Sequence, residues 1–273
     1  MVDAPSTFRE LLRADRDDGG WEPVTTGESG AGVFRSADGT RYAKCARADG
    51  VADLAAERDR VAWLATQGVP GPRVLDWRVG ADGAACMVTS AVAGVPADRV
   101  APAVLAAAWE AVAEAVRRLH DLPAERCPFS RDLARMWATA RDVVARGAVN
   151  PDFLPEEQQR TPPEELLARL APQLERRLEQ EVAGAVVCHG DLCLPNIVLD
   201  PEGGGVAGFI DLGRLGRADP YADVSLLFAT AREIWSDERS ARAAEEGFAR
   251  RYGIDLDRGR ERFYLHLDPL TWG

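Results

Sequence analysis

Apolar residues in the first part of the chain occur in short segments bounded by glycine, proline and aspartate, a pattern typical of β-strands. Four such segments predict strands, at 33–35, 42–45, 74–77 and 86–89. Between the second and the third, apolar positions recur at helical spacing over 54–64, and Gly68 follows as a helix end. The pattern predicts a small sheet-rich region that contains one helix.

Beyond residue 92 the pattern changes to that of helices. The segment 104–119 is rich in alanine and apolar nearly all round, which predicts a helix buried in the core. Further helical patterns lie near 131–146, 164–180, 221–235 and 241–251. A β-rich first part and an α-rich second part predict an α+β fold of two lobes, 1–92 and 93–273, with a cleft between them near 90–94.

Composition and charge narrow the classes of function. The chain has 273 residues, 46% of them hydrophobic and 28% charged, as in ordinary globular proteins. No apolar run reaches the ~18 residues of a membrane span, and the first residues include no apolar signal segment, so we expect a cytoplasmic protein without a membrane partner. The net charge of −11 argues against nucleic acid as the main partner and would suit a cationic substrate.

The five cysteines include no Cys-x-x-Cys pair, which is typical of free thiols in a reducing compartment. Cys188, His189 and Cys193 have side chains that can bind zinc, but they lack the usual spacing and an obvious fourth partner. We therefore do not expect a zinc site in this stretch.

A glycine-rich stretch, GESGAG at 27–32, leads directly into the strand at 33–35. Glycines allow backbone N–H groups to approach phosphate oxygens without an intervening side chain. No Gly-Lys-Ser/Thr follows, so this is not a Walker loop, and a plain glycine turn stays open as an alternative. Contacts with phosphate are expected from Gly27, Ser29, Gly30 and Gly32.

Lys44 is the only lysine among the 33 basic residues. Its ammonium is a compact point charge, unlike the wide planar fork of an arginine, and therefore suits a narrow phosphate site. Lys44 lies on the strand that pairs with the exit strand of the glycine-rich loop. Glu57, thirteen residues later on the following helix, is the expected ion-pair partner. Tyr42 points to the same sheet face as Lys44, where it would either stack on adenine or pack in the core.

The densest signal for catalysis is the stretch VVCHGDLCLPN at 186–196, in which an apolar strand leads to Asp191 and Asn196 follows five residues later. If the strand after Asn196 forms an antiparallel hairpin with the strand that ends at Asp211, these two residues come close together, since paired strands lie ~4.8 Å apart. Their oxygens would suit Mg²⁺. Asp191 would then accept a hydrogen bond from an incoming hydroxyl, as phosphoryl transfer requires.

These motifs resemble those of the aminoglycoside phosphotransferases, relatives of the protein kinases. The strings HGDLCLPN from His189 and FIDLGRLGRAD from Phe209 are similar to those of the 3′-phosphotransferase subgroup that acts on kanamycin and neomycin. The resemblance runs from about Trp21 to Asp268. It implies a bilobal, protein-kinase-like α+β fold, with nucleotide bound by the lobe at 1–92 and catalysis and substrate binding in the lobe at 93–273.

The resemblance also implies roles for individual residues and two cofactors, ATP and Mg²⁺. Asp191 would be the catalytic base, and Asn196 and Asp211 would bind Mg²⁺. Phosphates and adenine of ATP would be bound by Lys44 with Glu57 and by backbone groups of Ser90 and Val92. Substrate contacts would come from Asp191, Arg214, Glu156, Glu157, Arg232, Glu233 and Asp268. The tail after Asp268 departs from the Leu-Asp-Glu-Phe-Phe ending that is frequent in the family.

We therefore expect a monomeric enzyme that phosphorylates an aminoglycoside, at the 3′-hydroxyl, and so confers antibiotic resistance. Kinases of choline, homoserine or macrolides share the core motif and stay open as alternatives, as does a non-catalytic nucleotide-binding regulator. A protein kinase is disfavoured, because Asp219-Pro220 predicts a helix start eight residues after Asp211 and leaves little room for an activation segment.

Overall fold

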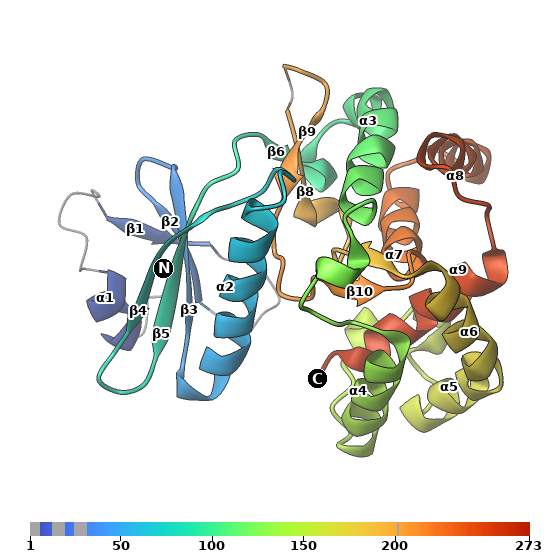
Figure 1. Cartoon of the computed structure of the whole chain (residues 1–273), viewed down its shortest axis with the longest axis horizontal. Coiled ribbons are helices and arrows are strands. Elements are labelled where there is room, and N and C mark those ends of the chain that lie inside the picture. The colour runs from blue at the N-terminus through green and yellow to red at the C-terminus, as the bar shows by residue number, and fades with distance from the viewer. Residues whose placement is uncertain (1–5, 13–19, 25–31, 201) are drawn as a thin grey trace. The chain divides into compact units, whose positions relative to one another are not determined.

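The computed structural model describes residues 6–12, 20–24, 32–200 and 202–273 (Figure 1). They group into two compact units. One contains the described residues up to Gly94 together with Ala207–Gly213, and the other contains Val95–Val206 and Arg214–Gly273. No helix within the described ranges combines the length and the apolar character needed to cross a bilayer.

The first unit is built on an antiparallel sheet in which, as far as the chain is described, five strands follow the order β1-β2-β3-β5-β4. The strands are β1 (Trp21–Pro23), β2 (Gly32–Ser36), β3 (Arg41–Ala46), β4 (Val74–Val79) and β5 (Ala85–Ser90). Two helices belong to the same unit, α1 (Ser6–Leu12) and α2 (Val51–Ala65). The four predicted strands and the predicted helix at 54–64 are confirmed, whereas α1 and β1 were not predicted.

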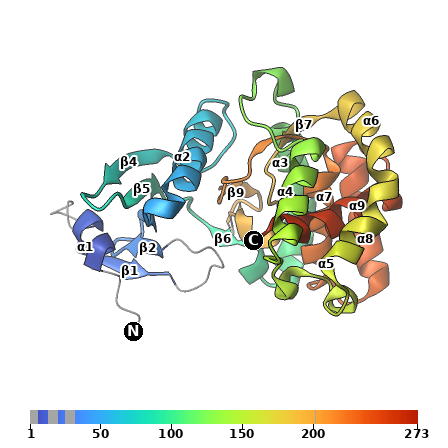
Figure 2. The ribbon, with the colours of Figure 1, turned by 90° about the horizontal axis from the view of Figure 1, so that it is seen from below.

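The two faces of this sheet pack against different helices, because successive side chains of a strand point to opposite sides. Ala43 of β3 belongs to a buried cluster with Phe8 of α1. Ala46 of β3 belongs to a second cluster with Leu54 of α2. Figure 2 shows α1 and α2 on different sides of the sheet. Lys44 has the parity of Ala46 and is therefore directed to the face that α2 covers.

The second unit is mainly helical. Its helices are α3 (Pro102–His120), α4 (Leu133–Ala145), α5 (Pro163–Leu170), α6 (Leu174–Gly184), α7 (Tyr221–Arg232), α8 (Glu238–Tyr252) and α9 (Arg258–Leu267). Short strands lie between them: β6 (Val95–Pro96), β7 (Val186–Cys188), β8 (Ile197–Leu199) and β10 (Gly216–Ala218). Strand β7 pairs with β10, and β9 (Val206–Phe209) completes the sheet order β6-β8-β9. The predicted hairpin of β8 and β9 is therefore present.

Two helical predictions need correction. The segment 164–180 forms two α-helices rather than one, because Pro172 lacks a backbone N–H and α5 ends at Leu170. The segment 104–119 is helical as predicted, but α3 buries one face instead of its whole circumference, and Val104 is 40% exposed. Its many alanines are apolar enough for the core and small enough for the surface, so the pattern alone did not separate the two faces.

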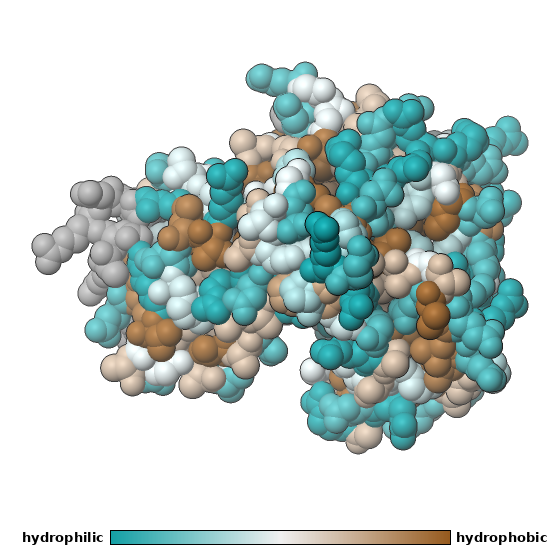
Figure 3. Space-filling view, in the orientation of Figure 1, coloured by the Kyte–Doolittle hydropathy of each residue, from teal (hydrophilic) through white to brown (hydrophobic). Residues whose placement is uncertain are grey.

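One core cluster of the second unit is formed mainly by α4, α5, α7 and α9, and α3 and α8 bury further large side chains such as Trp109 and Phe248. The largest members of this cluster are Tyr221 on α7 and Phe263 and Tyr264 on α9, each about fully buried. Among the described residues, four large hydrophobic side chains are exposed: Leu75, Val79, Val104 and Val182. In agreement, hydrophilic residues predominate on the face drawn in Figure 3, and apolar areas on it are small and separate.

Candidate functional site

In the first unit, Lys44 lies between two carboxylates. Its Nζ is 2.7 Å from Oε2 of Glu57 and 3.1 Å from Oδ1 of Asp211. The predicted Lys44–Glu57 ion pair is therefore present. Burial alone would lower the pKa of the Lys44 ammonium, but the charges of Glu57 and Asp211 outweigh this effect and raise the pKa above its ordinary value. Lys44 therefore stays protonated, and its ammonium can donate to phosphate oxygens.

Asp211 has an unusual backbone conformation. Its φ of +58° is the only positive value among the described residues other than glycine. Residues other than glycine rarely adopt this left-handed backbone conformation, and those that do often belong to a functional site. The Asp211 side chain is 47% exposed, against 10% for Glu57. Asp211 therefore offers a carboxylate to the surroundings, whereas Glu57 holds Lys44 from within the protein.

In the second unit, Asp191 lies on the loop that follows β7. The side-chain amide of Asn196 donates to the Asp191 backbone oxygen at 2.9 Å and to its Oδ2 at 3.0 Å. The N–H of Cys193 also donates to the Asp191 backbone oxygen, at 3.0 Å. Asn196 is buried and Asp191 is partly exposed. The loop therefore holds the Asp191 carboxylate in one orientation and leaves part of it accessible.

The turn before Asp191 is fixed by a residue that the sequence analysis missed. Both oxygens of Asp223, on the first turn of α7, accept backbone N–H groups of the loop, from His189 at 2.6 Å and from Gly190 at 2.8 Å. Gly190 has φ of +85°, and a Cβ there would overlap the backbone oxygen of Arg214. The available signal was an acid within the apolar helix YADVSLLF, where a charge is unexpected unless it has partners.

Residues predicted to contact substrate lie together at the end of the second unit. Asp268 is 2.5 Å from a guanidinium nitrogen of Arg131 and 3.7 Å from one of Arg214. Arg214 donates to the Thr271 hydroxyl at 2.9 Å, and its guanidinium carbon lies 3.3 Å from the centre of the Trp272 ring. The indole N–H of Trp272 donates to Asp268 at 3.0 Å. The Asp268 carboxylate is therefore engaged by two arginines of the protein itself, and Thr271 and Trp272 in the tail after Asp268 restrain Arg214.

The other residues predicted to contact substrate either have a different ion-pair partner or are exposed on the surface. Arg232, at the end of α7, is ion-paired with the buried Glu245 of α8 at 2.7 Å, and Glu233 follows it on the surface. Glu156 and Glu157 are exposed on a short 3₁₀ turn, Glu156–Gln158. Their contact with substrate stays a prediction.

The structure describes some, but not all, of the residues predicted to contact the nucleotide. Gly27, Ser29 and Gly30 lie outside the described residues. Gly32 begins β2 opposite Cys45, and Tyr42 of β3 is half-buried opposite Arg35 and Thr89. Ser90 ends β5 and donates its N–H to the Arg73 oxygen at 2.9 Å; Val92 follows and is half-exposed. Adenine binding by these groups stays a prediction.

The donor atoms at the predicted magnesium site fit that ion. Asp211 contributes a carboxylate that is half exposed. The Asn196 amide nitrogen is used by Asp191, so the atom that remains suited to a cation is its oxygen. Oxygen ligands of this kind, completed by phosphate and water, are those that Mg²⁺ prefers.

Comparisons with known proteins agree with this chemistry. Residues 20–264 match the model of the phosphotransferase enzyme family. The streptomycin 3″-kinase of Streptomyces griseus is 66% identical over 255 residues, 93% of each chain. An aminoglycoside 3′-phosphotransferase of Streptomyces fradiae is 43% identical over 92% of this chain and 94% of its own. Among solved structures, the aminoglycoside phosphotransferase APH(3″)-Id of Streptomyces rimosus in complex with ADP and streptomycin is similar with a TM-score of 0.94, 69% identity and full coverage of both chains.

These similarities confirm the predicted resemblance and the kinase-like α+β fold, and they support aminoglycoside phosphotransferase activity. They do not confirm the predicted 3′ position, because the relative of higher identity is a 3″-kinase. With a family model that matches 20–264 and relatives that match over nine-tenths of its length, the chain belongs to the phosphotransferase enzyme family.

Proposed function

We propose that this protein transfers the γ-phosphoryl group of ATP to the 3″-hydroxyl of streptomycin. The observation that carries the proposal is the 66% identity to the streptomycin 3″-kinase, against 43% to the Streptomyces fradiae 3′-phosphotransferase, over similar shares of the chain. The net charge of −11 favours a polycationic substrate such as an aminoglycoside. Phosphorylation would add negative charge to the drug, weaken its binding to RNA and so confer resistance.

Lys44 would bind phosphate oxygens of ATP. Its ammonium carries three N–H donors, and Glu57 restrains it from the protein side at 2.7 Å. Asn196 and Asp211 would hold Mg²⁺, which neutralises phosphate charge when it is bound. The glycine-rich stretch at 27–32 would add backbone N–H groups, and Ser90 and Val92 would meet the adenine ring.

Asp191 would accept a hydrogen bond from the reacting hydroxyl and then its proton. A carboxylate of ordinary basicity suffices, because the transition state of phosphoryl transfer is loose and the proton leaves late. What the reaction needs is orientation. Asn196 restrains Oδ2 of Asp191 at 3.0 Å, and Asp223 restrains the two residues before it. The carboxylate is therefore held in place before substrate arrives.

Phosphorylation of the 3′-hydroxyl of kanamycin-type drugs is the second candidate. It is favoured by the strings HGDLCLPN and FIDLGRLGRAD and by relatives with that activity at 43% and 40% identity. Both candidates share the chemistry and differ in the substrate half of the site. A cytoplasmic location and a monomeric state complete the proposal.

A drug panel with ATP and Mg²⁺ distinguishes the candidates. Streptomycin, kanamycin and tobramycin are each supplied, ADP release gives kcat/KM, and ¹H–³¹P correlation spectra locate the phosphate. We expect streptomycin to have the highest kcat/KM, with a single phosphate on the 3″-oxygen. Kanamycin modified at the 3′-oxygen at a higher kcat/KM, with tobramycin unreactive because it has no 3′-hydroxyl, would instead establish the second candidate. Failure of all three drugs would contradict both.

A further inference from the structure

A row of hydrogen-bonded polar side chains connects α8 to α7 in the second unit. The Tyr252 hydroxyl on α8 is 2.7 Å from Nδ1 of His120, the last residue of α3. Nε2 of His120 is 3.0 Å from Oδ2 of Asp223 on α7. His120 is 4% exposed and Asp223 is fully buried. The polar atoms of His120 and Asp223 therefore bond to protein partners rather than to water.

The row ends at the loop that carries Asp191. Asp223 accepts the backbone N–H groups of His189 and Gly190, the two residues immediately before Asp191. Oδ2 of Asp223 makes hydrogen bonds with both the His189 backbone N–H and Nε2 of His120. A rotation of this carboxylate away from His120 would therefore also break its hydrogen bond with the loop. The orientation of Asp223 and the backbone position of Asp191 are thus coupled.

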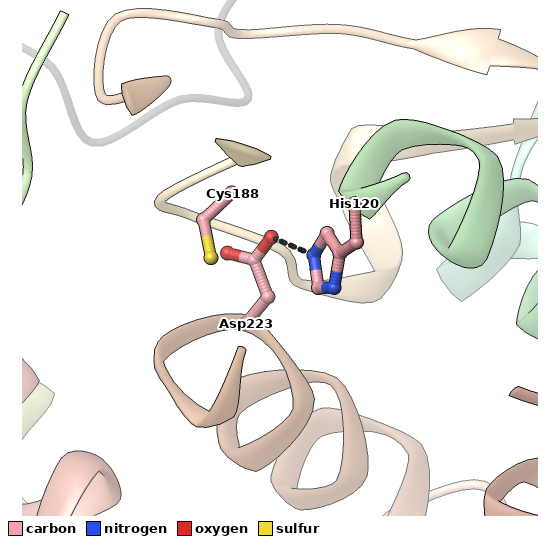
Figure 4. A group of neighbouring side chains, drawn as sticks. All are labelled: His120, Cys188 and Asp223. Atoms are coloured by element: carbon pink, nitrogen blue, oxygen red, sulfur yellow. Dashed lines mark hydrogen bonds and ion pairs between the residues drawn. The ribbon is translucent and has the colours of Figure 1, made fainter. Parts of the chain in front are cut away.

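His120 is the side chain that completes the environment of Asp223 (Figure 4). A carboxylate without exposure is unfavourable unless donors surround it. Burial raises the pKa of Asp223, but the His120 hydrogen bond, together with the charge of His120 and the Gly190 N–H, outweighs it and lowers the pKa below its ordinary value. His120 supplies the side-chain donor of this set.

The same group resembles a metal site, because His120, Cys188 and Asp223 place ligand atoms within 4.8 Å of one another. The hydrogen bonds argue against that interpretation. The two oxygens of Asp223 already accept two backbone N–H groups and the His120 ring, and the Cys188 thiol donates to the Asp219 oxygen at 3.3 Å. The group is a buried carboxylate held by N–H donors.

We propose that His120 is a positioning residue for phosphoryl transfer: through Asp223 it fixes the backbone before Asp191 and so aims the Asp191 carboxylate at the reacting hydroxyl. Tyr252 orients the His120 ring. His120 touches neither ATP nor drug in this proposal, which rests on the proposed function because it takes Asp191 as the base. Its loss should therefore lower kcat and leave substrate binding nearly unchanged.

Three variants test the proposal with streptomycin, ATP and Mg²⁺. His120→Leu removes the ring nitrogens, and His120→Gln restores an N–H near the position of Nε2. Trp109→Phe is the matched control, because it removes a 2.8 Å hydrogen bond between the same helices, α3 and α8, from the Trp109 indole to the Ala244 oxygen. We expect His120→Leu to lower kcat about 10- to 100-fold, as loss of an outer partner of a functional group does, with both KM values changed less than about 3-fold. His120→Gln should recover most of kcat, and Trp109→Phe should keep it.

Hydrogen exchange of a peptide that spans 187–192 provides a readout independent of activity. Exchange should accelerate in His120→Leu and return toward the wild-type rate in His120→Gln. Wild-type kcat and exchange in His120→Leu, or equal loss in the Leu and Gln variants, would overturn the inference. If His120→Leu does not fold, Tyr252→Phe decides: a lowered kcat at constant KM supports the proposal, and a wild-type kcat contradicts it. Wild-type protein without transferase activity would defeat the proposed function instead, and the exchange rates would still test whether His120 holds the loop.

Discussion

Replacing Lys44 by methionine should destabilise the protein mainly through Glu57. The substitution keeps most of the side-chain volume but removes the ammonium, which leaves the carboxylate of Glu57 10% exposed and without its partner at 2.7 Å. Breaking a buried ion pair by removing one member costs about 3–5 kcal/mol of unfolding free energy. The pair with Asp211, whose side chain is 47% exposed, adds at most about 1 kcal/mol. We therefore expect a total loss of about 3–6 kcal/mol.

A double-mutant cycle separates the loss of the pair from the uncompensated charge. Glu57→Gln removes that charge, so the variant with both substitutions should be more stable than Lys44→Met alone, with a coupling free energy of at least about 2 kcal/mol. Urea denaturation at pH 7.5 measures all four proteins. Asp59→Asn is the control: it breaks an ion pair with Arg58 of the same length, 2.7 Å, on the same helix but exposed to solvent, and should cost less than about 1 kcal/mol.

Lys44→Arg separates charge from shape. It keeps the positive charge, so stability should stay within about 1 kcal/mol of the wild type, while the planar fork replaces a point charge beside Glu57 and Asp211. We expect kcat/KM for ATP to fall about 100-fold or more, measured by ADP release. A coupling free energy below about 1 kcal/mol would show that the Lys44–Glu57 pair is not a strong buried ion pair, and an arginine variant with normal kcat/KM would show that the shape of the cation is unimportant.

Three further predictions concern the second unit. Gly190→Ala should lower kcat by about 100-fold or more and cost about 1–3 kcal/mol of unfolding free energy, because φ at this position is +85° and the new Cβ would overlap the Arg214 oxygen. Steady-state kinetics and urea denaturation measure the two effects, and a normal kcat would contradict the prediction. Burial raises the pKa of Glu181 from 4.5 to about 7, so the native state binds the proton more tightly; its contribution is complete below pH 4.5 and is lost as pH rises through 7. Unfolding free energy should therefore fall by about 2 kcal/mol between pH 5 and 8. Glu181→Gln should remove this part of the pH dependence, and an unchanged profile would exclude Glu181. Trp272→Ala removes the ring that packs on Arg214 and the N–H that donates to Asp268. It should raise KM for streptomycin severalfold while KM for ATP stays constant. Equal changes in the two KM values would argue against a role of Arg214 and Asp268 in substrate binding.

Local contacts of the first unit could be predicted from the sequence. Strand alternation and helical spacing put Lys44 and Glu57 on facing elements only thirteen residues apart, and the structure joins them directly. The motif from His189 to Asn196 singled out Asp191 and Asn196 as functional residues, but the hydrogen bond between them was found only in the structure. In these cases the periodicity of each element determines which side chains meet.

Contacts between distant segments could not be predicted in this way. His120 and Asp223 are separated by 103 residues, and Arg131 and Asp268 by 137. No spacing rule connects positions so far apart, and even the unexpected acid at Asp223 does not identify its partner. Asp268 was predicted to bind substrate, whereas its carboxylate is already engaged by arginines and by Trp272. The position of the phosphorylated hydroxyl depends on this half of the chain, where the motifs are least informative.

The role of Asp191 as the base is tested by the effect of Asp191→Ala on phosphate transfer and on nucleotide binding, measured in the same preparation. Phosphate transfer to streptomycin should fall by about 100- to 10,000-fold, the range for loss of a general base. The Kd for ATP should stay within about 3-fold, because Lys44 and Asp211 are intact. Transfer at a near-normal rate by this variant would contradict the assignment of Asp191, and with it the mechanism proposed for the enzyme.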